Sequence, residues 1–149
     1  MNTLRERLSV VLPTYNEREN IQPLLNKLLT IGKEYELEIL IVDDDSTDGT
    51  PELIKELAQT DPRIRLVRRL GRSGLSSAIK EGLLDSIFNV AIVMDSDGQH
   101  KPEDVINAFK YFKKHNLDIV AGSRFLSKAE IRGLSQRRTG GSFWANRFS

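Results

Sequence analysis

The sequence contains no cysteine and only two histidines among its 149 residues. The absence of cysteine excludes a disulfide framework, a thiolate metal site and cysteine redox chemistry. It also suits a reducing compartment, so we expect a cytoplasmic protein. The apolar stretch between Arg7 and Pro13 is too short for a signal peptide or a membrane span. We therefore expect no transmembrane segment in this chain.

A large excess of charge is also absent, because 22 basic residues nearly balance 21 acidic ones and leave a net charge of +1. This balance argues against a general nucleic-acid-binding protein. The length and the apolar fraction of 39% are those of one globular domain. The charge is uneven, however, since residues 120–149 carry six Arg or Lys residues against one acid. That segment is either a solvated basic face or a site for an anion.

Short aliphatic runs alternate with amphipathic segments along the first 121 residues. The aliphatic runs predict five strands, at Leu8–Leu12, Glu38–Val42, Arg65–Arg69, Val90–Met94 and Asp118–Ala121. Helical spacing and helix-start signals predict helices over residues 21–29, from residue 50, around residues 75–83 and from residue 102. This alternation predicts an α/β fold with a mostly parallel sheet, in which ligands bind beyond the carboxyl ends of the strands.

Two of these helices carry recognisable start signals. Asn16 and Glu19 are spaced as a capping box for the first helix. Thr50 and Pro51 are placed as the N-cap and the first helical residue of the second. Both signals lie in turns that follow predicted strands.

An Asp-x-Asp pair follows the fourth predicted strand, in the run Met94-Asp95-Ser96-Asp97-Gly98-Gln99-His100. Asp95, Asp97 and Gln99 offer the hard oxygen ligands that Mg²⁺ and Mn²⁺ take, and a substrate diphosphate can complete the coordination shell. An ordinary strand-to-helix turn accounts for the same residue types, and an isolated Asp-x-Asp favours that interpretation. The neighbouring motifs must decide between the two.

A second acidic run, Asp43–Thr50, follows the second predicted strand and brings four carboxylates together. Because like charges repel, such a cluster must bind a cation, accept hydrogen bonds from a ligand or cap the following helix. Capping explains Asp48 and Thr50. It does not explain Asp44, whose carboxylate can accept hydrogen bonds from a base or a ribose.

Two further turns suit a nucleotide. Tyr15 follows Pro13 at the end of the first strand, where its ring either stacks on a base or lies at the edge of the domain as an amphipathic residue. The glycine-rich run Leu70–Ala78 opens a helix and can present backbone amides to a phosphate. It matches neither the Rossmann nor the Walker fingerprint.

The order of these motifs resembles the family 2 glycosyltransferases of GT-A fold, and among them the dolichyl- or polyprenyl-phosphate mannosyltransferases. The blocks that carry the resemblance are Val11–Asn20, Val42–Thr50, Gly74–Ala78, Met94–His100 and Gly122–Phe125. They extend over essentially the whole chain. The resemblance implies a Rossmann-like, mostly parallel sheet with helices on both faces, and a nucleotide-sugar-binding domain over residues 1–149.

The reaction implied by this resemblance is an inverting transfer of mannose from GDP-mannose to a dolichyl or polyprenyl phosphate, with Mg²⁺ or Mn²⁺ as cofactor. A phosphate monoester has its second pKa near ~6, so the acceptor oxygen is already ionised at neutral pH and needs little help from a general base. The metal and the arginines would instead neutralise the leaving diphosphate.

The resemblance also assigns residues. The nucleotide-sugar pocket would be lined by Pro13, Tyr15, Glu17, Val42, Asp44, Asp95, Ser96, Asp97, Arg124 and Arg138. The metal ligands would be Asp95, Asp97 and Gln99. Asp97, Arg124 and Arg138 would be catalytic, with Arg137 as the nearest competitor for the role of Arg138. Ser142 would lie on the lipid-phosphate side.

Two features depart from the family pattern. Ser96 and Gly98 stand where the branch commonly has Ala and Leu, a change that keeps the ligands but loosens the turn. A further block of the resemblance runs from Arg137-Arg138 through Ser142 to Ala145-Asn146. The sequence stops at Ser149, inside that block, so we expect the C-terminal acceptor-side portion to be truncated. We expect Phe143, Trp144 and Phe148 to lie either in a core or at a lipid boundary, in peripheral contact with the cytoplasmic face of a membrane.

Two other functions stay open on the sequence alone. A related transferase could use UDP-glucose or another nucleotide sugar, because base selection depends on fine contacts. A phospho-receiver signalling domain would also have acids at strand ends, as Asp43-Asp44 and Asp95 are here. The receiver's acid pair ends its first strand, however, whereas a complete strand and helix precede Asp43 in this chain.

Overall fold

The computed structural model describes residues 5–122 of the chain. Strands and helices alternate through this part of the chain. In order they are β1 (Arg7–Thr14), α1 (Arg18–Ile31), β2 (Glu36–Asp43), α2 (Thr50–Thr60), β3 (Ile64–Arg68), α3 (Leu75–Asp85), β4 (Ala91–Val93) and α4 (Pro102–His115). The predicted alternation is thereby confirmed, with the first four predicted strands and all four predicted helices in place.

The four strands form one parallel sheet in the order β3-β2-β1-β4. β1 and β2 pair over their whole length, from Arg7 opposite Glu36 to Thr14 opposite Asp43. β1 thus has β2 on one side and β4 on the other, which is the order of the doubly wound nucleotide-binding folds. In the receiver-type order β1 would lie between β2 and β3, so the topology argues against a phospho-receiver domain.

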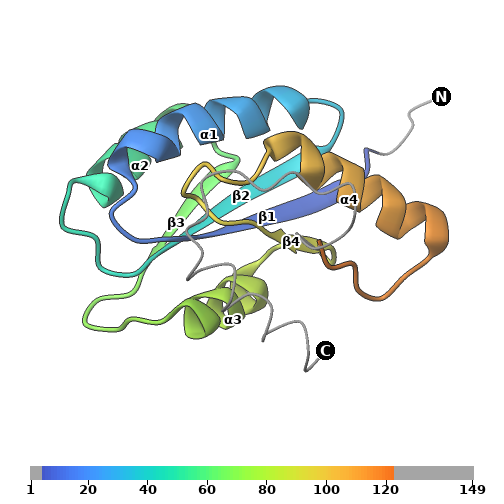
Figure 1. The fold of residues 1–149 in the computed structure, drawn as a ribbon. Helices are drawn as coiled ribbons and strands as arrows, with labels where there is room; N and C mark the ends of the chain where they lie inside the picture. Colours follow the sequence, from blue (N-terminus) through green and yellow to red (C-terminus); the bar gives the residue numbers. More distant parts are fainter. Residues whose placement is uncertain (1–4, 123–149) are drawn as a thin grey trace.

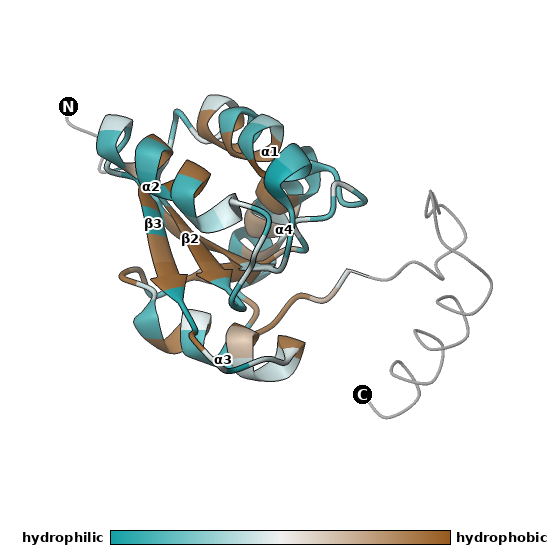
Figure 2. Cartoon of the chain, turned by 90° about the vertical axis from the view of Figure 1, so that its left-hand side faces the viewer, coloured by the Kyte–Doolittle hydropathy of each residue, from teal (hydrophilic) through white to brown (hydrophobic). Residues whose placement is uncertain are grey.

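Helices cover both faces of the sheet, as the resemblance implied. α1, α2 and α4 lie on one face and α3 lies alone on the other (Figure 1). Coloured by hydropathy, β2 and β3 are mostly apolar, while hydrophilic residues mark much of α1 and α2 (Figure 2). This distribution is typical of a sheet that is buried on both faces.

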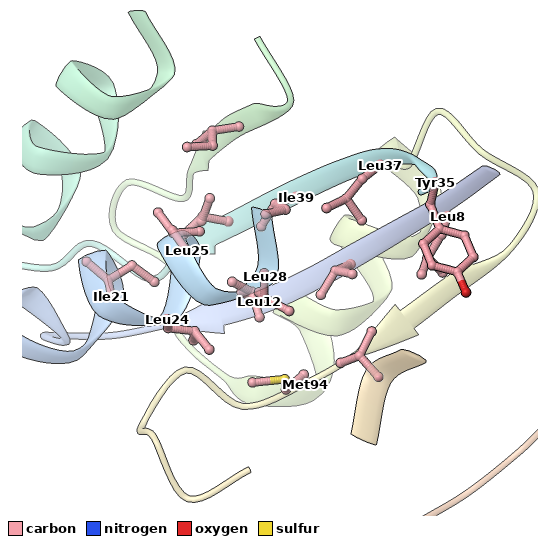
Figure 3. Close-up of a cluster of buried hydrophobic side chains, with 14 of the residues drawn as sticks. Leu8, Leu12, Ile21, Leu24, Leu25, Leu28, Tyr35, Leu37, Ile39 and Met94 are labelled. Atoms are coloured by element: carbon pink, nitrogen blue, oxygen red, sulfur yellow. The ribbon is translucent and has the colours of Figure 1, made fainter. Parts of the chain in front are cut away.

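The larger core lies between the sheet and the three-helix face. The apolar side of α1 comprises Ile21, Leu24, Leu25 and Leu28, all buried, and it faces β1 and β2 (Figure 3). These residues recur at helical spacing, and β1 and β2 are buried at every position after the first. Burial of so many apolar side chains provides the main stabilisation of the fold.

The smaller core lies under α3, where Val11, Leu40, Val42 and Ala78 form a second buried cluster. α3 can approach the sheet this closely because Gly82 faces it without a side chain. A Cβ atom at Gly82 would overlap the side chain of Val11 and lie 2.9 Å from Cγ2 of Val42. Only glycine fits this position without movement of the helix or the sheet.

The fifth predicted strand, Asp118–Ala121, is wrong. Residues 116–122 follow α4 without forming a strand, and Ile119 is 83% exposed. An aliphatic run becomes a strand only when a neighbouring strand satisfies its backbone hydrogen bonds, and no strand of the described residues pairs with this run. β4 is correspondingly short, with three residues paired to β1.

The two start signals marked real helices but the wrong N-cap residues. The N-cap residue of α1 is Glu17, and its side chain makes no capping hydrogen bond. Asn16 instead adopts a positive φ of 53°, and its side chain accepts a hydrogen bond from the backbone of Thr47. α2 has Gly49 at the N-cap, so Thr50 is its first helical residue. At Asn16 a contact between two loops outweighs the local capping pattern.

No helix among residues 5–122 has the length and apolar character needed to cross a membrane.

The close approach of α3 predicts the effect of Gly82→Ala. Overpacking of a tight contact costs about 1–3 kcal/mol, which outweighs the roughly 1 kcal/mol that alanine gains over glycine in a helix. We expect a lower free energy of unfolding, measured by urea titration followed by circular dichroism. Leu84→Ala on the same helix is the control, because Leu84 is 78% exposed and its loss should change stability by less than about 0.5 kcal/mol. An unchanged or higher stability of Gly82→Ala would contradict the packing described here.

Candidate functional site

Four loops leave the carboxyl ends of the strands at one edge of the sheet, which we call the carboxyl edge. They are residues 15–17 after β1, 44–49 after β2, 69–74 after β3 and 94–101 after β4. The loops after β1 and β4 flank the position where the strand order reverses, which is where open α/β sheets bind their ligands. Most of the site residues expected from sequence lie in these loops or at the strand ends that precede them.

The loop after β1 is bonded to the loop after β2. The backbone N–H of Asn16 donates to Oγ of Ser46 at 2.8 Å, and the N–H of Thr47 donates to Oδ1 of Asn16 at 2.9 Å. Ser46 in turn donates its hydroxyl to the buried carboxylate of Asp43. These bonds hold the backbone of Tyr15 in place while its side chain stays 60% exposed. The ring is therefore accessible to a ligand at a fixed place on the carboxyl edge.

Asp48 caps two helices at once. Its carboxylate accepts the backbone N–H of Arg18 at 3.1 Å, where α1 begins, and that of Thr50 at 3.0 Å, where α2 begins. Partial loss of hydration is the largest single influence on the pKa of the exposed Asp48 carboxyl and raises it, but the hydrogen bonds from the Thr50 hydroxyl and these backbone groups together outweigh it. The pKa of Asp48 is therefore lowered. The prediction that capping explains Asp48 is confirmed.

Two further carboxylates of the acidic run are paired with Arg68, the last residue of β3, and with Arg69, which follows it. Asp44 forms an ion pair with Arg69, and Asp45 lies 3.4 Å from Arg68. The N–H of Gly74 also donates to Asp44, at 2.8 Å. These ion pairs offset part of the charge repulsion expected from sequence within the chain itself. Sequence reasoning missed both arginines, whose signal was their place just before the glycine-rich run.

Arg69 is the most connected of these residues, and its side chain is only 3% exposed. Besides Asp44, its guanidinium contacts Glu81 at 3.1 Å, the hydroxyl of Ser77 at 2.5 Å and the carbonyl of Gly74 at 3.3 Å. These partners lie in α3 or in the loop before it. Arg69 therefore joins the glycine-rich run to the end of β2.

The turn after β4 is fixed to the end of β1. Met94 is buried, and its backbone N–H donates to the carbonyl of Val11 at 3.0 Å. Ser96 is also buried, and its hydroxyl donates to the carbonyl of Pro13 at 3.0 Å. This bond places the Asp-x-Asp turn beside the loop that carries Tyr15.

The predicted metal ligands occupy this turn. Oδ1 of Asp97 accepts the N–H of Gln99 at 3.0 Å, and the carboxylate of Asp95 lies 3.8 Å from Nδ1 of His100. Within residues 5–122 no group of three or more His, Cys, Asp or Glu side chains is arranged to hold a metal. Two carboxylates and an amide nevertheless supply hard oxygen donors in one turn, which fits part of the shell of Mg²⁺ or Mn²⁺.

The remaining predicted pocket residues lie close to these loops. Pro13 and Val42 are opposite each other in the pairing of β1 with β2, and both are buried. Glu17 ends the loop after β1 and accepts a hydrogen bond from the side chain of Asn20 at 2.7 Å. The structure brings all the predicted pocket and metal residues before residue 123 to the carboxyl edge. Their contacts with a ligand stay predictions.

Several predicted residues lie outside the part of the chain that the structure describes. They are Arg124, Arg137, Arg138, Ser142, Phe143, Trp144 and Phe148.

Comparison with known proteins gives a family match over most of the chain. The sequence profile of glycosyl transferase family 2 matches residues 9–148. The chain is 38% identical over 125 residues to the dolichol-phosphate mannosyltransferase of Pyrococcus furiosus, covering 84% of this chain and 35% of that protein. It is 36% identical over 152 residues to the polyprenol monophosphomannose synthase of Mycolicibacterium smegmatis, covering 97% of this chain and 55% of that protein. The chain thus spans between about a third and a little over half of these relatives.

Solved structures share the fold. The mannosyltransferase PcManGT of Pyrobaculum calidifontis, in complex with GDP-Man and Mn²⁺, aligns with a TM-score of 0.61 and 31% identity, over 74% of this chain and 33% of that one. TarS of S. aureus, in complex with UDP-GlcNAc, aligns with a TM-score of 0.62 and 25% identity, over 87% of this chain and 37% of that one. The predicted GT-A fold class is confirmed.

The double cap at Asp48 predicts a pH-dependent loss of stability. Asp48→Ala should lower the free energy of unfolding at pH 7 by about 0.5–1 kcal/mol, since the side chain is exposed and the helix starts lose an acceptor. Because its pKa is lowered in the folded protein, this stabilisation is fully present above the ordinary Asp pKa of about 3.9. It is lost as the pH falls through the lower, folded value.

Urea unfolding of the wild type and Asp48→Ala between pH 7 and pH 3 measures this effect. The stability difference should be constant from pH 7 to about pH 5 and should shrink below about pH 4. Glu56→Ala, an exposed acid on α2, is the control and should show no comparable pH-dependent difference. A difference for Asp48→Ala that is absent at pH 7, or that grows in acid, would show that the carboxylate does not stabilise the helix starts.

Proposed function

The chain belongs to glycosyl transferase family 2, and from this we propose that it forms the nucleotide-sugar-binding half of an inverting mannosyltransferase. The donor would be GDP-mannose and the acceptor a dolichyl or polyprenyl phosphate. One structural observation carries the proposal. The Asp-x-Asp turn lies beside the loop of Tyr15 at the position where the strand order reverses, fixed there by the bond from Ser96 to Pro13.

The relatives support this choice of reaction. Two of them, at 36–38% identity, are named for mannose transfer involving dolichol phosphate or polyprenol monophosphate, and they match most of this chain. PcManGT, at 31% identity, was solved with GDP-Man. Since the chain spans only part of the length of each, the activity of the whole protein is part of the proposal.

The nucleotide would lie over the loops after β1 and β2. The exposed ring of Tyr15 offers an aromatic surface for a base. Asp44 would accept hydrogen bonds from the nucleoside, and Glu17 would line the same side of the pocket. Pro13 and Val42 would form its floor, since both are buried at the ends of adjacent strands.

The diphosphate would lie over the loop after β4. Asp95, Asp97 and Gln99 would hold Mg²⁺ or Mn²⁺, in agreement with the Mn²⁺ in the PcManGT complex. When bound, the metal would supply positive charge that stabilises the leaving diphosphate. The buried Ser96 would keep the turn in place through its bond to β1.

The acceptor side needs residues beyond position 122. We propose that Arg124 and Arg138 bind phosphate groups, and that Ser142 contacts the lipid phosphate. The acceptor phosphate would attack the anomeric carbon from the face opposite the diphosphate, so the configuration inverts. Because the acceptor is a lipid, we propose that the protein works in peripheral contact with the cytoplasmic face of a membrane.

The donor and the reaction can be tested together. The protein is incubated with Mn²⁺ or Mg²⁺, polyprenyl phosphate and a panel of labelled nucleotide sugars, and label is then measured in the lipid extract. We expect label in the lipid from GDP-mannose only, and only with the metal present. Transfer from a UDP-sugar instead would identify a different donor within the same family, as the UDP-GlcNAc complex of TarS illustrates.

Calorimetry tests donor binding separately from turnover. Asp97→Asn should weaken Mn²⁺-dependent binding of GDP-mannose at least about tenfold, because an amide oxygen carries no charge for the cation. Glu56→Gln on α2 makes the same acid-to-amide change on an exposed helix surface away from the four loops and should bind as the wild type does. Equal affinity of Asp97→Asn and the wild type in Mn²⁺ would contradict the proposed metal site.

A further inference from the structure

Arg69 lies at the carboxyl edge, but its side chain is buried rather than presented to solvent. It follows the last residue of β3, and its side chain is only 3% exposed. Arg72, three residues further on, has a side chain that is 60% exposed. A residue as buried as Arg69 can influence a ligand only through the groups that it contacts.

All three nitrogens of the Arg69 guanidinium have partners. Nη1 contacts Asp44 and the carbonyl of Gly74, Nε donates to Glu81 at 3.1 Å, and Nη2 donates to Ser77 at 2.5 Å. The planar guanidinium thus fixes three side chains relative to one another: Asp44, which follows β2, and Ser77 and Glu81 of α3. Lysine cannot replace it, because a single ammonium group on a flexible chain does not reproduce a planar fork with three nitrogens.

Asp44 is fixed by these contacts on both of its carboxylate oxygens. Oδ1 contacts Arg69, and Oδ2 accepts the N–H of Gly74 at 2.8 Å. Its own backbone N–H donates to the carbonyl of Thr14 at 2.9 Å, which ties it to the end of β1. The side chain is 11% exposed, so a small part of it remains reachable from solvent.

Charge adds a second consequence. Asp43 ends β2, and Asp44, Asp45 and Asp48 follow it in the next loop, which an anionic nucleotide has to approach. An unpaired carboxylate there would repel the diphosphate at short range. The pairing of Asp44 with Arg69 reduces that repulsion while it leaves lone pairs on the carboxylate for a nucleoside.

We propose that Arg69 is the positioning residue of the nucleotide pocket: it orients Asp44 toward the nucleoside, holds the glycine-rich loop against β2 and offsets the charge of Asp44. This inference rests on the proposed function, because it takes Asp44 as a contact to the nucleoside. Arg69 itself touches no part of the nucleotide. Its effect on binding therefore requires Asp44.

The test measures GDP affinity in Mn²⁺ by calorimetry and thermal unfolding by circular dichroism on the same samples. Arg69→Lys keeps the positive charge and should weaken GDP binding about tenfold or more. Mn²⁺-pyrophosphate, which has no nucleoside, should bind to Arg69→Lys within about twofold of its affinity for the wild type. Ser77→Ala removes one contact of Arg69 and keeps the ion pair, so it should weaken GDP binding by a smaller factor of about two to five in a fully folded protein.

Arg65→Lys is the matched control. Arg65 lies near the start of β3, at the edge of the sheet opposite the four loops. It pairs with Glu38, and with Asp85 at 2.9 Å. The same substitution there should lower the melting temperature and leave GDP affinity unchanged. A loss of affinity that merely follows loss of stability would appear in both variants and would overturn the proposal.

A double-mutant cycle with Asp44→Asn decides whether Arg69 acts through Asp44. In the Asp44→Asn background, Arg69→Lys should change GDP affinity by less than about twofold. Effects that multiply independently would overturn the proposal, as would a folded Arg69→Lys protein that binds GDP like the wild type.

The two proposals fail in different ways. If the wild type binds no nucleotide of the panel in Mn²⁺, the proposed function is wrong, and the role of Arg69 is wrong with it. If the wild type binds GDP but Arg69→Lys binds it equally well, only the role of Arg69 is wrong. If the wild type prefers UDP, the proposed donor is wrong, and the same variants then test Arg69 with UDP as the ligand.

Discussion

The parallel pairing of β1 with β2 is the constraint on which the rest of the structure depends. The two strands are paired at every residue and buried after their first residue, so the helices on both faces pack against them. Because the strands are parallel, both of them end at the same edge of the sheet. Tyr15 and Asp44, which are 29 positions apart in sequence, therefore lie in neighbouring loops. Without this pairing there would be no common site.

The loops of the carboxyl edge are held to one another mainly by their own polar side chains. Asn16 and Ser46 join the first two loops, Ser96 joins the last to β1, and Arg69 joins the third to the end of β2. Such bonds organise the site before a ligand arrives, which lowers the entropy lost on binding. They also account for the acidic run of residues 43–48, whose charges would otherwise oppose one another. Stability and binding thus depend on overlapping contacts.

Local sequence patterns predicted correctly which side of a helix is buried. They were less reliable for features that depend on a hydrogen-bond partner elsewhere in the chain. The spacing of Ile21, Leu24 and Leu28 predicted α1 correctly, since apolar periodicity follows directly from which side of a helix is buried. The capping box at Asn16 was wrong because the side chain of Asn16 accepts a hydrogen bond from the backbone of Thr47, which lies in another loop. The strand at Asp118–Ala121 was wrong because a strand requires a neighbour.

By itself, the sequence determined the α/β class, the alternation of elements, the family and the acidic turns at strand ends, because these depend on composition, periodicity and motif order. Only the tertiary structure decided the strand order β3-β2-β1-β4 and the partner of each carboxylate. Asp44 illustrates the difference. Its position after a strand was visible in the sequence, but its pairing with Arg69, 25 residues away, depends on β3 lying next to β2. Non-local pairing of this kind is set by the packing of the whole sheet, which no short pattern contains.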